Sequence, residues 1–445
     1  MIPAAESPRV QRALLLLLIT QFWTGYCLST ISFESLQGKN ILVIGGSGRV
    51  GGSVVTQLVQ RGSKVSVGGT SRDHFSQAQA RWTRIFPQFD FQNIAFHKVD
   101  REVAESITPI IQDYDLVIHT AGPFQGKVKT PNGVLEACVR ASVPYLDVCD
   151  DYCTASAAKA KYASQAKVPC IVSTGTWPGV SSLLAKQLVH KALAKDPSLQ
   201  PADLKVDFGF FTAGSGGAGV TLLVATFLIL AEKALTIVDG RRIPVPPLKD
   251  FEYVNFGDIV GDRAIAPLNL LETASVHDYL GVGSTSAKFG TAPSYWNTLL
   301  GLFGSMVPKE VLENEPFMRK LSVFSMPIVR IVDFFAGATN AIRVDLSAKG
   351  LGKLATAIYA HENLEPCVGE SIIAFAAAAL TESAVPPGVW FTEEAIAAGD
   401  DCAAVLHLAS VGAHTCVVEG LDLSKDEIFG SSIKQRPKTT KSGKR

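Results

Sequence analysis

Hydrophobic and polar residues alternate between two patterns over the first third of the chain. Short strand-like segments, the first of them continuously apolar, fall at 41–45, 64–68, 93–99, 116–119, 145–148 and 170–173. Runs of this length suit buried strands of a parallel sheet. Between them apolar residues recur every three or four positions, as at Val50, Val54 and Leu58, which predicts helices packed on that sheet. The alternation predicts an α/β fold, with a doubly wound, six-stranded parallel sheet of the Rossmann type.

The pattern changes after Pro178 and predicts a second, α+β domain for substrate binding or dimerisation. Strand-like alternation spans 205–212 and returns at 341–348. A mostly helical C-terminal region then returns to the first domain. The expected division is a targeting presequence at 1–37, an NADP-binding Rossmann domain at 38–176, a second domain at 177–348, a C-terminal region at 349–432 and a basic tail at 433–445.

The N-terminal residues have the pattern of a targeting sequence. Arg9 and Arg12 precede an apolar run at 13–23, and several Ser and Thr residues follow it. The run is shorter than the roughly 20 apolar residues that a spanning helix needs. A removed presequence is therefore favoured over an anchor, and no membrane contact is expected of the mature protein. A plastid leader and a secretory signal peptide both fit.

Composition excludes several classes of protein. Lys plus Arg (41) balances Asp plus Glu (41), so the chain has no net charge with which to bind nucleic acid or acidic membranes. Hydrophobic residues make up 47% and charged residues 18%, which is typical of a globular protein at the apolar end of the range. The eight cysteines are scattered and form no CxxC pair, so neither a disulfide framework nor a metal site is expected.

The turn after the first strand carries a dinucleotide-binding motif. Gly46, Gly48 and Gly51 form Gly-x-Gly-x-x-Gly between an apolar strand and an amphipathic helix. Such glycines permit the tight turn, the approach of the backbone to a pyrophosphate and the contact of helix with strand, while the N–H groups of the helix N-terminus face the anion. The expected pyrophosphate-binding residues are Gly46, Ser47, Gly48, Arg49, Val50 and Gly51.

The end of the second strand favours NADP over NAD. NAD enzymes have an acidic residue here, about 20 residues beyond the glycines, which binds the ribose 2′-hydroxyl. This chain has Thr70, Ser71 and Arg72, and an arginine makes charge-assisted hydrogen bonds to a 2′-phosphate. A shift of one residue in the strand end would bring Asp73 to the site and weaken this prediction. Farther along the same sheet edge, the expected cofactor contacts are Asp100, near the adenine, and Ala121, Gly122, Pro123 and Phe124.

Several segments resemble the saccharopine dehydrogenase-like family, most closely its plant and algal branch. They lie at 41–51, 119–124 (HTAGPF), 145–147 (YLD), 175–179 (GTWPG), 216–219, 289–296 (FGTAPSYW) and 387–391 (PGVWF). The resemblance implies an NADP-dependent oxidoreductase that transfers a hydride to or from a carbon bonded to nitrogen in a small amino or imino substrate. It also implies a homodimer and, through the plant-like branch, a plastid location, with the secretory pathway as the alternative.

Four residues after the fifth strand are candidates for proton transfer. Asp147, Asp150, Asp151 and Tyr152 lie at the same edge as the cofactor loop, and neighbouring carboxylates raise one another's pKa. Asp is also a preferred N-cap, so these residues equally suit the start of the next helix. Better characterised family members often have Gly-Glu here, where this chain has Cys-Asp-Asp-Tyr. That difference leaves a non-catalytic NADP(H)-binding or redox-sensing protein as the alternative function.

Other residues have both a functional and a structural interpretation. His119 is either a proton carrier or a buried structural histidine, and Arg330 and Arg343 either bind a substrate carboxylate or form surface ion pairs. The glycines at 214–219 form either a second anion site before an apolar helix or a flexible turn. Trp177 either walls the substrate cleft or belongs to the core.

Overall fold

A parallel sheet organises the first part of the chain. The computed structural model describes residues 29–130, 132–213 and 219–430. Within these residues the sheet has the order β15-β6-β5-β4-β1-β2-β3, and each neighbouring pair is parallel. The order reverses between β1 and β4, as in a doubly wound Rossmann sheet. The strands are β1 (Asn40–Ile44), β2 (Lys64–Gly69), β3 (Ala95–Lys98), β4 (Leu116–His119), β5 (Tyr145–Asp147), β6 (Pro169–Val172) and β15 (Gly388–Phe391).

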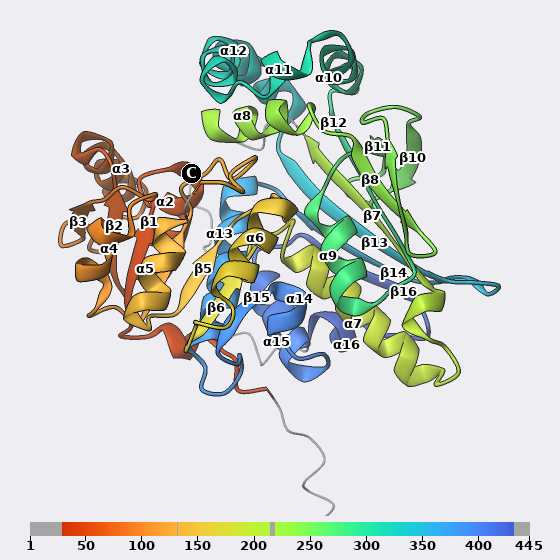
Figure 1. The fold of residues 1–445 in the computed structure, drawn as a ribbon, viewed down its shortest axis with the longest axis horizontal. Helices are drawn as coiled ribbons and strands as arrows, with labels where there is room; N and C mark the ends of the chain where they lie inside the picture. The colour runs from red at the N-terminus through yellow and green to blue at the C-terminus, as the bar shows by residue number, and fades with distance from the viewer. Residues whose placement is uncertain (1–28, 131, 214–218, 431–445) are drawn as a thin grey trace, which may run out of the picture. The chain divides into compact units, whose positions relative to one another are not determined.

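Helices cover both faces of this sheet because successive residues of each buried strand point to opposite faces. Ile41 and Val43 belong to the same buried cluster as α2 (Arg49–Gln60) and α13 (Leu364–Leu380). Leu42 and Ile44 belong to the cluster on the other face. The remaining helices of this part are α3 (Arg72–Ile85), α4 (Ala104–Ile111), α5 (Gly133–Ala141) and α6 (Tyr152–Tyr162). The predicted Rossmann fold is confirmed (Figure 1).

The C-terminal region adds a strand to the Rossmann sheet, whereas its helical pattern predicts only helices packed on it. Its strand β15 pairs with β6 and extends the predicted six strands by one. Its helix α13 packs along α2. The pairing of β15 with β6 therefore joins residues more than 200 positions apart in one sheet.

The folded part begins earlier than residue 38. The short 3-10 helix η1 (Phe33–Leu36) ends in Leu36, which is fully buried in the same cluster as α2. Ile31 is also buried there, and the Arg61 guanidinium lies 4.0 Å above the Phe33 ring. A presequence cleaved after residue 37 would therefore remove part of this core. The apolar run at 13–23 and the tail at 433–445 lie outside the described residues.

A mixed sheet forms the second part of the chain. Its order within the described residues is β10-β11-β12-β7-β13-β14-β16, with the β8–β9 hairpin attached to β12. The antiparallel pair β13–β14 spans the expected domain boundary at 348, so residues on both sides of it share one sheet. The strands are β7 (Leu204–Ala213), β8 (Ala234–Val238), β9 (Arg241–Val245), β10 (Glu252–Asn255), β11 (Asp262–Pro267), β12 (Ser284–Ala292), β13 (Thr339–Ala348), β14 (Gly352–His361) and β16 (Thr415–Gly420).

The helices of the second part fall into two groups. One group lies between the two sheets and consists of α7 (Val180–Lys195) and the helices that contact it, α9 (Leu271–Leu280), α14 (Thr392–Ala395), α15 (Asp400–Ala409) and α16 (Lys425–Phe429). The 3-10 turn η2 (Pro201–Asp203) follows α7 in the chain. The other group gathers at one end of the mixed sheet (Figure 1); it comprises α8 (Val220–Ile229), α10 (Tyr295–Met306), α11 (Lys309–Leu312) and α12 (Glu315–Ala336). Across the part of the chain that the structure describes, none of the helices combines the length and the apolar character needed to cross a bilayer.

Two buried carboxyl groups lie where α7, α9 and α14 meet. Glu272, at the start of α9, accepts a hydrogen bond of 2.7 Å from the Ser181 hydroxyl, and Glu393 of α14 is equally buried. Burial raises the pKa of Glu272 to about 7, and the negative charge of Glu393 acts in the same direction. The folded protein therefore favours the neutral form of Glu272.

A Glu272→Gln substitution should stabilise the protein more at pH 8 than at pH 5. Because the folded pKa of about 7 exceeds the ordinary value of 4.5, folding takes up a proton between these values, and the free energy of unfolding falls as the pH rises through this window. Glutamine keeps an oxygen for Ser181 and does not titrate. Melting temperatures at pH 5 and pH 8 test this: the gain of the variant over the wild type should be larger at pH 8 by roughly 2 °C or more. Equal gains at the two pH values would contradict it.

Candidate functional site

The glycine loop holds α2 against the end of β1. Gly45 turns the chain with a φ of 84°, and a Cβ there would lie 2.9 Å from the backbone nitrogen of Ala121. A Cβ at Gly51 would lie 2.3 Å from the carbonyl oxygen of Gly45 and 2.6 Å from Thr120 Oγ1. Both positions therefore require glycine. The tight turn belongs to Gly45, one residue before the motif that the sequence singled out.

Helix α2 presents its N-terminus at this loop. Gly48 is the N-cap, and within the described residues no side chain caps it. The first N–H groups of a helix have no partner inside the helix, and the helix dipole adds a partial positive charge there. Arg49 lies in this first turn, where its Nε is 2.5 Å from Glu365 Oε1 of α13. The loop of Gly46, Ser47, Gly48, Arg49, Val50 and Gly51 thus fits the pyrophosphate of a dinucleotide.

The residues after β2 keep their predicted order. The strand ends at Gly69, so Thr70, Ser71 and Arg72 follow it directly. The Ser71 hydroxyl accepts a hydrogen bond of 3.2 Å from the backbone of His74 and so caps α3. The Arg72 side chain is exposed, with its guanidinium carbon 5.8 Å from the centre of the Phe96 ring. Because α3 begins at Arg72, Asp73 lies in its first turn, and Arg72 keeps the expected position shortly after β2.

The loop after β4 connects the glycine loop to α8. Its Ala121 lies against Gly45, and Arg101 donates a hydrogen bond to the Ala121 carbonyl oxygen. A Cβ on Gly122 would lie 3.5 Å from a methyl group of Thr221 in α8. Pro123 and Phe124 complete the loop, and Asp100, beyond β3, accepts a hydrogen bond of 3.0 Å from the backbone of Glu102. The expected cofactor contacts therefore lie along one edge of the sheet.

Asp147 belongs to a buried network. Its carboxylate accepts hydrogen bonds from the Tyr145 hydroxyl at 2.9 Å and from the backbones of Cys149 and Ser173 at 3.0 and 2.8 Å. Since the Tyr145 proton is directed at Asp147, His119 Nδ1 donates to the Tyr145 oxygen, 3.1 Å away. Burial lowers the pKa of His119 to about 3, so this histidine is neutral. Asp147 and His119 support the sheet.

Asp151 and Tyr152 begin helix α6. The Asp151 carboxylate caps this helix, accepting hydrogen bonds from the backbones of Thr154 at 3.0 Å and Gly126 at 2.7 Å. The Tyr152 ring stacks on Phe391 of β15, and its hydroxyl donates to the Asp278 carboxylate. Neither side chain lines the cavity described next. The capping interpretation of this segment therefore holds for Asp151.

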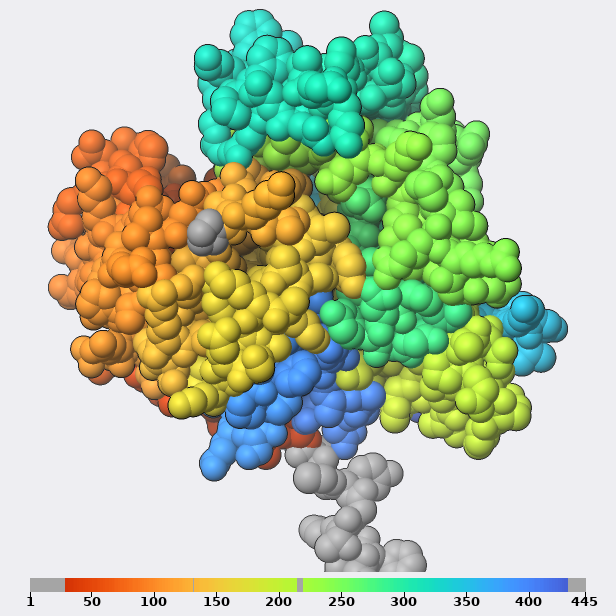
Figure 2. All heavy atoms as spheres, viewed as in Figure 1, coloured from red at the N-terminus to blue at the C-terminus, as the bar shows by residue number. Residues whose placement is uncertain are grey.

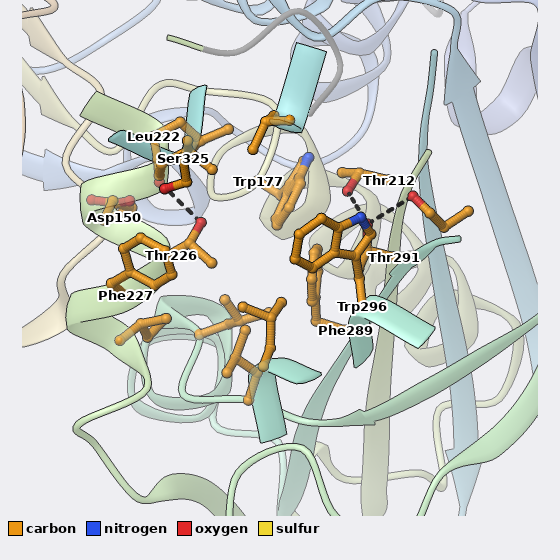
Figure 3. Close-up of a pocket in the computed structure, with 18 of the residues that line it drawn as sticks. Asp150, Trp177, Thr212, Leu222, Thr226, Phe227, Phe289, Thr291, Trp296 and Ser325 are labelled. Carbon is orange, nitrogen blue, oxygen red and sulfur yellow. Dashed lines mark hydrogen bonds between the residues drawn. The ribbon is translucent and has the colours of Figure 1, made fainter. Parts of the chain in front are cut away.

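Asp150 lines a cavity of about 210 Å³ (Figure 3). Gln125, Asp150 and Trp177 reach it from the segments that follow β4, β5 and β6, while α8, α10 and α12 form its other walls. Burial raises the pKa of Asp150 to about 6, against the effect of a hydrogen bond with the Gln125 side chain. Among the four proton-transfer candidates, the structure brings this one to a cavity at the cofactor edge.

Aromatic rings form one wall of the cavity. Trp177 stacks on Phe289 of β12 at 5.7 Å between ring centroids and on the buried Phe210 of β7 at 5.2 Å. Figure 3 shows Trp177, Phe289 and Trp296 on one side of the cavity, with Asp150 and Phe227 across from them. Trp177 therefore both walls the cavity and packs on the core.

The described lining of the cavity lacks a cation. Its charged side chains are Asp150 and Asp333, and the rest are mostly aliphatic or aromatic. Arg343 instead pairs with Asp345 at 2.7 Å, and Arg330 pairs with Asp333 at 3.5 Å; neither arginine lines the cavity. The glycine cluster before α8 falls at 214–218, outside the described residues apart from Gly219, and its sequence has no charged residue.

Sequence reasoning missed the parts of this site that depend on packing between distant elements. Gln125 was adjacent to the predicted loop at 121–124 and its position after β4 was a usable signal. The inward residues Ser325, Val329 and Val332 of α12 repeat at helical spacing, yet nothing local connects them with Asp150.

Comparisons with known proteins agree with this geometry. The sequence pattern of the saccharopine dehydrogenase NADP binding domain matches residues 41–169. No curated protein matches the sequence. Among solved structures, apo histidine-tagged saccharopine dehydrogenase (L-Glu forming) from Saccharomyces cerevisiae has a similar fold, with a TM-score of 0.54 and 10% identity over 86% of this chain and 99% of that chain.

Two further solved structures are similar over only about a quarter of the chain. Pen from Bacillus thuringiensis is 21% identical, with a TM-score of 0.21, over 25% of this chain and 37% of that chain. The reductase/Diels-Alderase MalC from Malbranchea aurantiaca is 13% identical, with a TM-score of 0.23, over 27% and 60%. Neither adds an argument about this protein. Residues 41–169 thus match the saccharopine dehydrogenase NADP binding domain, and the fold of the chain is similar to that of saccharopine dehydrogenase.

Proposed function

We propose that this protein is an NADP-dependent oxidoreductase that transfers a hydride to or from a substrate held in the cavity beside Asp150. One observation carries the proposal: a carboxyl group with a raised pKa lines a mainly apolar cavity at the edge of the sheet that also bears the dinucleotide loop. Hydride transfer needs a site that excludes water and a side chain that exchanges a proton with the substrate.

The residues at this edge fit NADP. The N-terminus of α2, with the glycine loop, would hold the pyrophosphate, and Arg72 would pair with the 2′-phosphate. The other half of the dinucleotide would extend past Ala121 and Phe124 toward the cavity, since Rossmann folds bind their ligands across the point where the strand order reverses. When bound, NADP supplies or accepts the hydride. The protein supplies orientation, a dry environment and the proton.

Asp150 would exchange the proton. With a pKa of about 6, both its neutral and its ionised forms are populated near neutral pH. In the reductive direction the neutral carboxyl donates a proton to the substrate heteroatom, and in the oxidative direction the carboxylate accepts it. The carbon–nitrogen chemistry implied by the resemblance suits this cavity, because a carboxylate also pairs with a protonated amine or imine.

The competing hypothesis is a non-catalytic NADP(H)-binding protein. The unusual Cys149–Asp150–Asp151–Tyr152 segment suggested it, but in the structure this segment caps a helix and brings one carboxyl group to the cavity. A binding protein would retain NADPH affinity and show no chemistry that depends on Asp150.

Arg72→Ala should remove the preference for NADPH over NADH. The guanidinium is expected to make charge-assisted hydrogen bonds to the 2′-phosphate, so NADPH affinity should fall about tenfold or more while NADH affinity stays the same. Isothermal titration of the full chain with both nucleotides measures this. Arg84→Ala is the matched control, since it removes an exposed arginine from the far end of the same helix. Equal effects of the two substitutions would count against the assignment of Arg72.

Asp150→Asn should abolish most turnover and its pH dependence. Loss of a general acid costs roughly 10²- to 10⁴-fold in kcat. For the wild type in the reductive direction, kcat/KM should fall as the pH rises through about 6, because the neutral carboxyl is the donor. NADPH absorbance, followed with an active imine found by screening, gives both quantities.

Asp151→Asn is the control for this prediction. The oxygen of asparagine can keep the cap bond from Thr154, whereas its amide nitrogen cannot accept the second bond, from Gly126. Helix α6 should therefore be retained, and the rate should fall far less than in Asp150→Asn. A wild-type rate in Asp150→Asn, or the same loss in both variants, would contradict the role of Asp150.

A further inference from the structure

Helix α12 carries apolar side chains on two opposite faces. Its inward residues, which line the cavity, are Ser325, Val329, Val332 and Asp333. Its outward residues are between 54% and 83% exposed and repeat at helical spacing; they are Val323, Phe324, Ile328, Ile331, Phe334 and Phe335. A helix on the surface of a soluble protein ordinarily has a polar outward face, whereas one that is apolar all round is buried in protein or in lipid.

Helix α10 repeats this arrangement. Its sequence, YWNTLLGLFGSM, has no charged residue. Trp296 and Leu300 line the cavity, while the outward residues, between 48% and 77% exposed, are Tyr295, Leu299, Leu302 and Met306. These four, with the six outward residues of α12, form what we call the outer face. Figure 2 shows the atoms of this part of the chain, in teal, gathered at the top of the view.

The outer face is larger than a soluble monomer usually leaves in water. An aromatic side chain has roughly 150–250 Å² to bury. Phe324, Phe334 and Phe335, each at least 77% exposed, therefore present several hundred Å² by themselves. The largest apolar patch on a soluble monomer is usually about 300–600 Å², and larger ones mark interaction sites. With seven further exposed side chains on α10 and α12, the total apolar area that these two helices expose exceeds that range.

The charged side chains around the outer face balance one another, which suits a lipid surface without net charge. From 323 to 335 the charged residues of α12 are Arg330 and Asp333, which pair with each other. Residues 309–320 carry Lys309, Arg319 and Lys320 against Glu310, Glu313 and Glu315, so three positive charges balance three negative ones. The helices thus have a charged end and an apolar side, as interfacial helices do, without a basic surplus that would select anionic lipids.

The cavity lies behind the helices that bear the outer face. Helices α10 and α12 each supply residues to both, and the cavity reaches the surface at Leu222 of α8, which lines it while being 39% exposed. The cavity lining is mainly apolar and, among the described residues, offers no Lys or Arg to a carboxylate. A ligand that fits this lining dissolves better in lipid than in water.

We propose that the outer face docks on a membrane surface whose lipids carry no net charge. The substrate is then a mainly apolar molecule without a carboxylate, which passes from the lipid into the cavity. The proposal rests on the proposed function in taking the cavity as the substrate site. It departs from the sequence expectation of no membrane contact, and the contact is with the surface of the lipid, since no described helix is of a kind that crosses it.

A fluorescent label on the outer face tests the docking. The full-length Phe334→Cys variant, with Cys27, Cys153 and Cys416 changed to Ser, carries an environment-sensitive nitrobenzoxadiazole label and is mixed with phosphatidylcholine vesicles. We expect its emission to shift to shorter wavelength. Leu351→Cys, in the turn at the opposite end of β13, is the matched control and should show no shift. The apolar run at 13–23 is present in both proteins and cannot cause a difference between them.

Two results of this experiment would overturn the docking. One is the absence of a shift at position 334, or an equal shift at 351. The other is a label at 334 that is already shielded without vesicles and becomes exposed on dilution, because a second copy of the chain then covers the outer face.

A neutral apolar fluorophore, N-phenyl-1-naphthylamine, tests the substrate class. Val329→Arg places a cation in the cavity and should weaken binding of the fluorophore about tenfold or more, whereas Val323→Arg on the outward side of the same helix should not. NADPH titrations of the same proteins separate the two proposals. If NADPH binds and the fluorophore does not, the substrate class is wrong and the proposed function stands. If the fluorophore binds and NADPH does not, the oxidoreductase function fails instead.

Discussion

The contact between helix α2 and the turn at Gly45 is the constraint on which the rest of the site depends. A Cβ at Gly51 would lie 2.3 Å from the Gly45 carbonyl oxygen, so the N-terminus of α2 meets the end of β1 with only hydrogen atoms between them. Gly45 in turn lies against Ala121, and Gly122 lies against Thr221 of α8. Through these contacts the anion-binding end of α2 is positioned relative to α8, which forms one wall of the apolar cavity.

The surroundings of Asp147, Asp150 and Asp151 decide which of these carboxyl groups is suited to proton transfer. Asp147 is stabilised as an acceptor of three hydrogen bonds, and Asp151 is committed to the cap of α6. Asp150, between these two in sequence, extends into the cavity, where burial raises its pKa to about 6. Neighbouring residues of one type thus acquire structural and chemical roles from their environment, which is how proteins tune acids for catalysis.

The local part of this structure could be predicted from the sequence, and the part that depends on distant pairing could not. The strands from β1 to β6, the glycine loop and the position of Arg72 follow from short-range patterns of apolar residues and glycines. Strand β15 joins the Rossmann sheet by pairing with β6, and no local pattern specifies that partner. The hairpin of β13 and β14, by contrast, is a local pairing, and the expected boundary at 348 falls at its turn.

Helix α12 and the start of the fold show two further limits. The apolar residues of α12 surround the helix, so periodicity predicts a helix without identifying which face is exposed. Ile31 and Leu36 follow a targeting-like segment, and only their burial against α2 shows that they belong to the folded domain.

The most direct test of the account is a crystal structure of the protein with NADP bound. The account predicts the 2′-phosphate at Arg72, the pyrophosphate at the N-terminus of α2, and the nicotinamide ring at the cavity between Asp150 and Trp177. A nicotinamide ring bound outside this cavity, away from Asp150, would contradict it.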